Sequence, residues 1–340
     1  MQIAKREAAG VAVETPVAQV VARPGRQVTL PVETGVAIVL LALSLWLARA
    51  FPDFRTGANA AVILTSVAEI GIVAAGMTLV IATGGIDISV GSIVGLSGVV
   101  LGQLTVERHW GVGPAILMTM AAGAACGLVN GLLIARFKLP PIIATLATFS
   151  AARAGAYVLS KGNSLSGLPE SITNIGYNSW FGVPIPAWIA LAALVATGIL
   201  LKKTTFGRSV LALGGNREAA RLSGLSTMRT EALVYVLIGL LAGLAAVVVT
   251  ARGATAVPDA GKLFELRAIT AVVVGGTPVI GGRATLFGTA LGVLTIGVVQ
   301  NGVVSYGKDA MWEMLVMAIV LLASVEVDRW RRARAMRAKA

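Results

Sequence analysis

The chain has 340 residues, of which 56% are hydrophobic and 13% charged, and its mean hydropathy is +0.84. This composition excludes an ordinary soluble domain and indicates a membrane protein. The net charge of +12 does not indicate nucleic-acid binding, because the basic residues gather in predicted loops and at the termini. One histidine and one cysteine, Cys126, cannot build a conventional Cys/His cage, so we expect neither a metal site nor a cofactor.

Apolar runs long enough to cross a hydrocarbon core of about 30 Å recur along the chain. Backbone groups in lipid must be satisfied within their own segment, so the spans are expected to be helices. The predicted spans are residues 33–51, 60–82, 88–105, 113–135, 141–160, 187–201, 231–251, 268–282, 285–304 and 310–327. The sequence therefore predicts an all-α, polytopic integral membrane protein with about ten transmembrane helices, some of them broken, in a domain covering residues 33–327.

The distribution of Lys and Arg predicts which side of the membrane each connection occupies. With ten spans, the basic residues of the N-terminal arm (1–32), of the 202–230 loop and of the tail (328–340) all fall on one side. The positive-inside rule places that side, and both termini, in the cytoplasm. Residues 161–186 form the longest connection on the opposite side. No cleavable signal pattern starts the chain, and the basic tail is expected to contact anionic membrane lipid.

The segment TGGIDISVGS, residues 83–92, interrupts the apolar pattern after the second predicted span. Two adjacent glycines break a membrane helix, and Asp87 offers an acceptor where the next helix must begin, so an N-cap is the simpler interpretation. The alternative is a broken helix lining a cavity, since irregular backbone at membrane depth persists only where protein or water covers it. The candidate gating residues of this segment are Gly84, Gly85, Asp87, Ser89 and Gly91.

A second glycine group precedes the 285–304 span and contains Gly275, Gly276 and Gly282. We include these glycines among the candidate gating residues. Their resemblance to the first group is explained as well by shared turn chemistry as by internal duplication.

Three polar side chains within apolar runs are candidates for lining a translocation pathway: Glu69, Asn130 and Asn301. An intramembrane carboxylate is a functional candidate by default, whereas an amide often fastens one helix to another. Interhelical packing is therefore the competing interpretation for each of them. An ion-coupled secondary transporter would use Glu69 or Asp87 to carry the coupling proton.

Two enzyme classes are disfavoured. Gly95-Leu96-Ser97-Gly98 has the form found in intramembrane serine proteases, but the only histidine, His109, is predicted in a polar loop and is poorly placed to act as the base. No G-x-x-x-x-G-K-[ST] nucleotide motif is present. Any ATP that drives this protein must be hydrolysed by another subunit.

The segment GGNREAARLSGL, residues 214–225, is charged although it lies between two long apolar runs. Glu218-Ala219-Ala220, followed after three residues by Gly224, matches the E-A-A-x-x-x-G pattern by which ABC importer permeases engage their ATPase. Together with TGGIDISVGS and with VVVGGTPVIGGRATLFGTALG and QNG in 272–302, it makes the chain similar to the ribose-type sugar permeases, whose relatives include branched-chain amino acid permeases. The resemblance covers about residues 60–327.

The resemblance implies a permease subunit of the bacterial inner membrane that moves a monosaccharide or sugar-like solute into the cytoplasm. It implies an ATP-binding cassette ATPase, a periplasmic solute-binding protein and a second permease subunit, identical or different, and no catalytic residue in this chain. We expect a short helix at 214–225 to dock in the ATPase, with Ala219 and Ala220 facing the floor of its groove. An ordinary solvated loop would explain the charges but not the Ala-Ala and Gly spacing. The implied coupling residues are Asn216, Arg217, Glu218, Ala219, Ala220, Arg221 and Gly224.

Overall fold

A computed structural model of the protein describes residues 32–308, together with residues 312, 314–316, 318–320, 322–323 and 326. The N-terminal arm, apart from Val32, and the basic tail lie outside these residues, as does part of the predicted span 310–327. The described part is almost entirely helical, which confirms the predicted all-α class.

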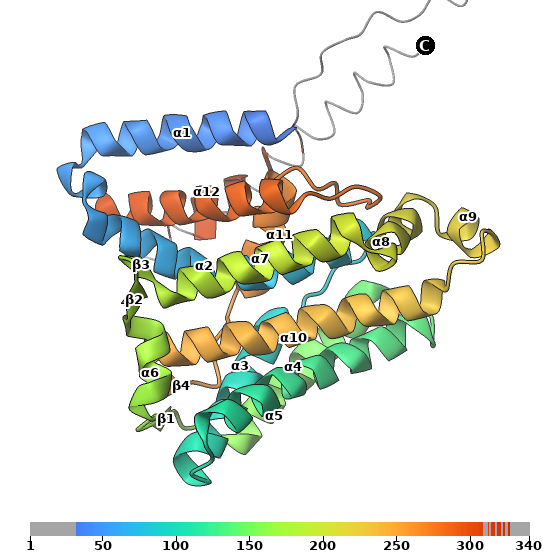
Figure 1. Cartoon of the computed structure of the whole chain (residues 1–340), viewed down its shortest axis with the longest axis horizontal. Coiled ribbons are helices and arrows are strands. Elements are labelled where there is room, and N and C mark those ends of the chain that lie inside the picture. The colour runs from blue at the N-terminus through green and yellow to red at the C-terminus, as the bar shows by residue number, and fades with distance from the viewer. Residues whose placement is uncertain are drawn as a thin grey trace, which may run out of the picture. The chain divides into compact units, whose positions relative to one another are not determined.

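The elements follow one another along the chain as shown in Figure 1. They are α1 (Val32–Ala50), η1 (Pro52–Arg55), α2 (Gly57–Ala82), α3 (Val90–Gly102), the π-helical η2 (Gln103–Glu107), α4 (Val112–Ala135), α5 (Pro141–Leu159), β1 (Leu165–Ser166), α6 (Glu170–Tyr177), β2 (Ser179–Trp180), β3 (Val183–Pro184), α7 (Ile185–Lys203), α8 (Thr205–Gly215), α9 (Arg217–Leu222), α10 (Thr227–Gly253), β4 (Thr255–Ala256), α11 (Phe264–Val274) and α12 (Leu286–Ser305).

Eight helices in the described part are long and apolar enough to cross a membrane: α1, α2, α3 with η2, α4, α5, α7, α10 and α12. They match eight predicted spans to within a few residues. The predicted span 268–282 is wrong in its extent, because α11 has only 11 residues and ends at Val274. The chain then turns at Gly276, whose φ is +94°, and Pro278 follows, so the helix cannot continue.

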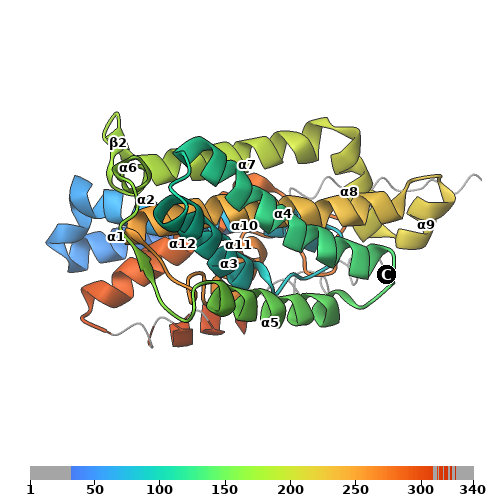
Figure 2. The same ribbon diagram turned by 90° about the horizontal axis from the view of Figure 1, so that it is seen from below.

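The helices differ in how much of their surface the protein itself covers. The most buried are α2, α3 and α10, whereas α1 is largely exposed along its length. In α2 every residue from Val67 to Ala82 is buried, as expected of a helix that is apolar on all sides. The central helix α10 packs against α4 and α2, while α7 and α5 lie on opposite sides of it (Figure 2).

Small residues bring α4 and α10 into close contact. Gly123, Gly127 and Gly131 recur every four residues on α4, and a Cβ at Gly127 would overlap the carbonyl oxygen of Tyr235 on α10. A Cβ at Gly123 would likewise overlap the carbonyl oxygen of Gly239. This is the small-residue packing that lets membrane helices associate without a hydrophobic driving force.

The connections separate to two ends of the helices (Figure 1). At one end lie α8 and α9. At the other end, α6 lies beside two short antiparallel pairs, in which Leu165 of β1 faces Ala256 of β4 and Trp180 of β2 faces Val183 of β3. Residues 161–186 and the 202–230 loop are therefore at opposite ends, in agreement with the predicted topology.

Candidate coupling site

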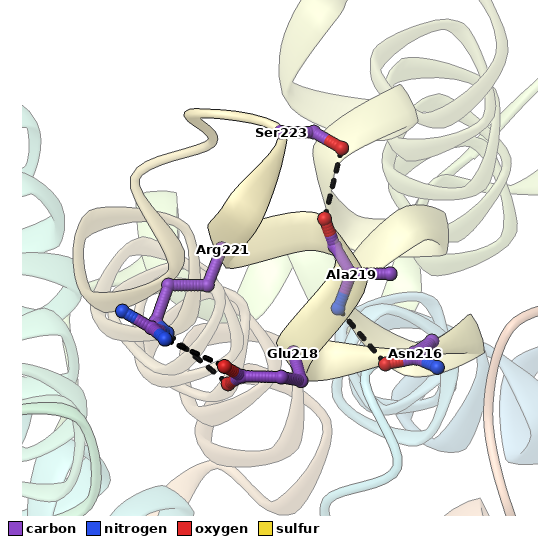
Figure 3. A network of polar contacts seen from close by, with 5 residues as sticks. All are labelled: Asn216, Glu218, Ala219, Arg221 and Ser223. Atoms are coloured by element: carbon purple, nitrogen blue, oxygen red, sulfur yellow. Dashed lines mark hydrogen bonds and ion pairs between the residues drawn. The ribbon is translucent and has the colours of Figure 1, made fainter.

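The predicted coupling segment is folded as a short capped helix, α9 (Figure 3). The side chain of Asn216 accepts a hydrogen bond from the amide of Ala219 at 3.0 Å and so caps the amino end. The hydroxyl of Ser223 donates to the carbonyl of Ala219 at 2.8 Å. Gly224 follows with φ of +80°, a conformation that ends the helix at low cost only in glycine.

Charged groups of α9 form two ion pairs with different surroundings. Arg221 donates to both carboxylate oxygens of Glu218, at 3.1 and 2.5 Å, on the exposed surface of the helix. This hydrogen-bonded pair lowers the pKa of Glu218. Arg217 instead pairs with Glu231 of α10, whose side chain is buried. The second pair ties α9 to the first turns of α10, and no motif or spacing in the sequence indicates it.

The two alanines of the motif do not share a face of α9. Ala219 is exposed, but Ala220 is only 5% exposed and faces the protein's own interior. The expectation that both alanines face the ATPase is therefore wrong for Ala220, because consecutive helical residues point about 100° apart. The exposed face instead carries Glu218, Ala219 and Leu222, and the side chain of Leu222 is 73% exposed.

The helix α8, which precedes α9, is packed tightly against the end of α2 and against the turn that leads to α12. A Cβ at Gly214 would overlap the carbonyl oxygen of Ala82 and would lie 2.6 Å from the amide nitrogen of Gly282. These two groups are hydrogen bonded, since Gly282 N–H donates to Ala82 O at 2.9 Å. A Cβ at Gly281 would lie 2.7 Å from the amide nitrogen of Gly84. We call these five residues, Ala82, Gly84, Gly214, Gly281 and Gly282, the glycine junction.

The two predicted glycine groups therefore meet in space. Gly84 and Gly282 have φ of +81° and +79° and turn the chain at the junction. Gly275, by contrast, has an ordinary φ, and its hydrogen allows close packing, since a Cβ there would overlap the carbonyl oxygen of Gly288 in α12. The junction joins the end of α2, the end of α8 and the turn that leads to α12.

Two further glycines of the first group are also needed for close approach. Gly85 lies against the side chain of Tyr235, whose hydroxyl would be 2.6 Å from a Cβ at that position. Gly91, near the start of α3, lies against the backbone of Gly261. Gly85, Asp87 and Ser89 of the segment between α2 and α3 are thus covered by protein, as irregular backbone at membrane depth requires, whereas Gly84 is exposed.

The prediction that Asp87 caps the third span is wrong. Ser89 is the N-cap residue of α3, and Asp87 accepts hydrogen bonds from the Ser89 amide at 2.8 Å and its hydroxyl at 2.6 Å. Asn130 of α4 donates to the same hydroxyl at 2.8 Å. All three side chains are fully buried. They fasten the broken segment to α4, which explains why these polar residues lie within apolar runs.

The other two pathway candidates have separate partners. Glu69 of α2 forms an ion pair with Arg252, at 2.8 Å from Nε, near the end of α10. Asn301 of α12 donates to Asn59 of α2 at 2.7 Å, and Asn59 donates back at 3.2 Å. The structure does not gather Glu69, Asn130 and Asn301 into one site. Their role in translocation stays a prediction.

The protease alternative lacks a base. Ser97 is buried in α3, whereas His109, the only histidine of the sequence, is exposed beyond η2. A histidine exposed beyond the end of the helix is poorly placed to take a proton from a hydroxyl in its interior.

Comparison with known proteins decides the family. Residues 59–325 match the model of the family described as branched-chain amino acid transport system / permease component. The chain belongs to this permease family. It is a multi-pass permease of the ABC importer type in the bacterial inner membrane.

Named relatives are similar over most of their length to this permease. The ribose import permease protein of Bacillus subtilis (strain 168) is 42% identical over 289 residues, which cover 83% of this chain and 88% of the relative. The L-arabinose ABC transporter permease protein of Azospirillum brasilense is 39% identical over 299 residues, 88% of each chain. The fructose import permease protein of Rhizobium meliloti is 34% identical over 278 residues, 79% of this chain and 77% of the relative. No solved structure matches the chain.

Proposed function

We propose that this permease moves a monosaccharide or a sugar-like solute into the cytoplasm, driven by ATP hydrolysis on a separate subunit. The observation that carries the proposal is its similarity, over more than three quarters of each chain, to permeases named for ribose, L-arabinose and fructose import. These three solutes share a small polyhydroxylated skeleton and differ in ring size and stereochemistry. Monosaccharide is therefore the substrate class that we assign.

The partners that we propose are an ATP-binding cassette ATPase, a periplasmic solute-binding protein and a second permease subunit. The exposed face of α9, with Glu218, Ala219 and Leu222, is the proposed contact with the ATPase. An amphipathic helix that presents an exposed leucine beside a charged rim is suited to a groove of a partner. Asn216 and Gly224 hold this helix by its two ends and need not touch the ATPase themselves.

Two connections are proposed to carry movement of α9 into the membrane domain. The first is the ion pair of Arg217 with Glu231, which pulls directly on α10. The second is α8, which bears on the glycine junction through Gly214. Because that junction touches the end of α2 and the turn before α12, displacement of α8 acts on both glycine turns together. The two turns are the proposed hinges of the transport cycle.

The ion-coupled alternative is not favoured. Glu69, its first candidate proton carrier, is paired with Arg252, and Asp87 accepts two hydrogen bonds from Ser89. Glu69 thus has a cationic partner and Asp87 is bound through Oδ1, although its Oδ2 has no hydrogen-bond partner among the described residues. The relatives named above are import permeases, one of them named as part of an ABC transporter.

Purification of the affinity-tagged permease from cells that express the whole transport system tests the proposal. We expect an ATPase to be retained with it and the same cells to take up a labelled pentose, with unlabelled monosaccharides as competitors. Capture of the permease without any ATPase, from cells in which uptake is active, would contradict the proposed partnership. A system that takes up no labelled monosaccharide, pentose or hexose, would contradict the substrate class.

A further inference from the structure

An open apolar groove runs between α7 and α12 and ends at two lysines. The groove has a volume of about 360 Å³ and is lined along α7 by Leu194, Gly198 and Ile199 and along α12 by Phe287. Ile199 and Phe287 are 55% and 65% exposed, so the groove opens at the surface of the protein. Among the described residues, its charged lining groups are Lys202 and Lys203, in the last turn of α7.

The dimensions of the groove fit one leaflet of a membrane. From Leu191, the lining residue of α7 farthest from the lysines, to Lys203 the helix rises about 18 Å, at about 1.5 Å for each residue. One leaflet contributes about half of a hydrocarbon core that is about 30 Å thick. The two lysines therefore lie at headgroup depth when the apolar lining is at acyl-chain depth. Trp188, near the other end of α7, is placed as interfacial tryptophans are.

Neither lysine has a charge partner in the part of the chain that the structure describes. Within residues 32–308 neither ammonium group takes part in an ion pair, and both side chains are exposed. Two adjacent cations beside an apolar groove on the cytoplasmic side complement the phosphate of an anionic lipid whose chains lie in the groove. A protein partner would have to supply carboxylates at this depth, whereas lipid phosphates lie there in every membrane.

We propose that this groove is a binding site for an anionic phospholipid, with its phosphate held by Lys202 and Lys203 and an acyl chain between α7 and α12. Because Lys203 lies next to Thr204, the residue that caps α8, the bound headgroup sits at the start of the helix that reaches the glycine junction. The proposal does not depend on which solute the permease transports.

The test uses the full-length permease, purified in mild detergent and freed of lipid. It is titrated with phosphatidylglycerol or with phosphatidylcholine of the same acyl chains, and bound lipid is counted by native mass spectrometry. We expect tighter binding of phosphatidylglycerol. Replacing both lysines, as Lys202→Gln with Lys203→Gln, is expected to weaken its binding about thirtyfold, at about fivefold for each charge near the membrane surface. Phosphatidylcholine binding should be unchanged.

Two further variants separate the charge from the groove and from the general basic surface. Gly198→Leu is expected to weaken the binding of both lipids. A Cβ at this position meets only Leu286, at 3.6 Å, so the leucine side chain fits without a clash and occupies the groove. The matched control, Arg136→Gln with Lys138→Gln, removes two exposed charges at the end of α4 and should change neither affinity by more than about twofold.

Three results would overturn the proposal. The first is equal binding of the two lipids by the unmodified permease. The second is a loss of phosphatidylglycerol binding in the control as large as in the lysine variant. The third is a Gly198→Leu variant that keeps its lipid but loses permease dimers, which would assign the groove to a second copy of the chain.

Discussion

Adding a single methyl group at Gly214 tests whether the glycine junction transmits motion from the coupling loop. In the Gly214→Ala variant the new Cβ would overlap Ala82 O and lie 2.6 Å from Gly282 N, and both neighbours are backbone atoms that cannot rotate away. Overpacking a fitted contact costs about 1–3 kcal/mol, and the gain in helix propensity from glycine to alanine is about 1 kcal/mol. The contact between α8 and the two glycine turns is therefore destabilised by up to about 2 kcal/mol.

The adjacent Gly215 supplies the matched control. A Cβ at Gly215 meets no atom within 4 Å, so Gly215→Ala has the same gain in propensity without the overlap. The assay is ATP hydrolysis by the complete transporter in proteoliposomes, with and without loaded binding protein. A penalty of about 2 kcal/mol corresponds to roughly thirtyfold, so we expect stimulated hydrolysis and uptake to fall by up to this factor in Gly214→Ala only. Equal behaviour of the two variants, with the permease intact in both, would refute the transmitting role of the junction.

Four other predictions concern α9 and the hydrogen-bonded pair Asn59 and Asn301. Asn216→Ala removes the cap of α9, which costs about 1 kcal/mol, and should lower stimulated ATP hydrolysis about fivefold without loss of membrane insertion. Unchanged hydrolysis would contradict the proposal that a folded α9 contacts the ATPase. Glu218→Gln should change uptake by less than about twofold, because its pair with Arg221 is exposed. The folded-state pKa of Glu218 is lowered, so the pair's contribution to stability is present above the unfolded-state pKa of about 4.3 and is lost only as the pH falls through the lowered pKa. Between about pH 6 and 8, coupling should therefore show no change that depends on Glu218. A titration in this range that disappears in the Glu218→Gln variant would contradict this. Asn301→Ala should lower the melting temperature as much as Asn59→Ala, because each removes the same pair of hydrogen bonds. A raised KM for sugar in Asn301→Ala alone would place Asn301 in the pathway, and an unchanged KM would assign it to helix packing.

Most of the membrane-spanning helices could be predicted, because a helix that faces lipid and a helix buried in the protein are both rich in apolar residues. The span 268–282 shows where this fails. Its residues are mostly apolar, yet Gly276 adopts a positive φ and Pro278 follows, so the chain turns where the apolar pattern continues. Hydropathy measures transfer into an apolar environment and carries no information about backbone conformation.

The site was only partly predictable. The motif located α9, but it could not show that Ala220 faces inward, because that depends on how α9 packs against α8 and α10. The pairs Arg217 with Glu231 and Glu69 with Arg252 have no local spacing signal, since each joins helices that meet only in the folded chain. The glycine junction likewise unites three distant segments. Each glycine was visible in the sequence, but its contacts were not.

The central claim is that hydrolysis of ATP by a partner subunit drives solute import through this permease. The most direct measurement is uptake of a labelled monosaccharide into proteoliposomes that contain the permease and its ATPase, with loaded binding protein outside and ATP inside. We expect uptake to require internal ATP, to stop when the phosphate-binding lysine of the ATPase is replaced, and to be unaffected by a protonophore. Uptake that persists without ATP and stops when the proton gradient is dissipated would contradict the account.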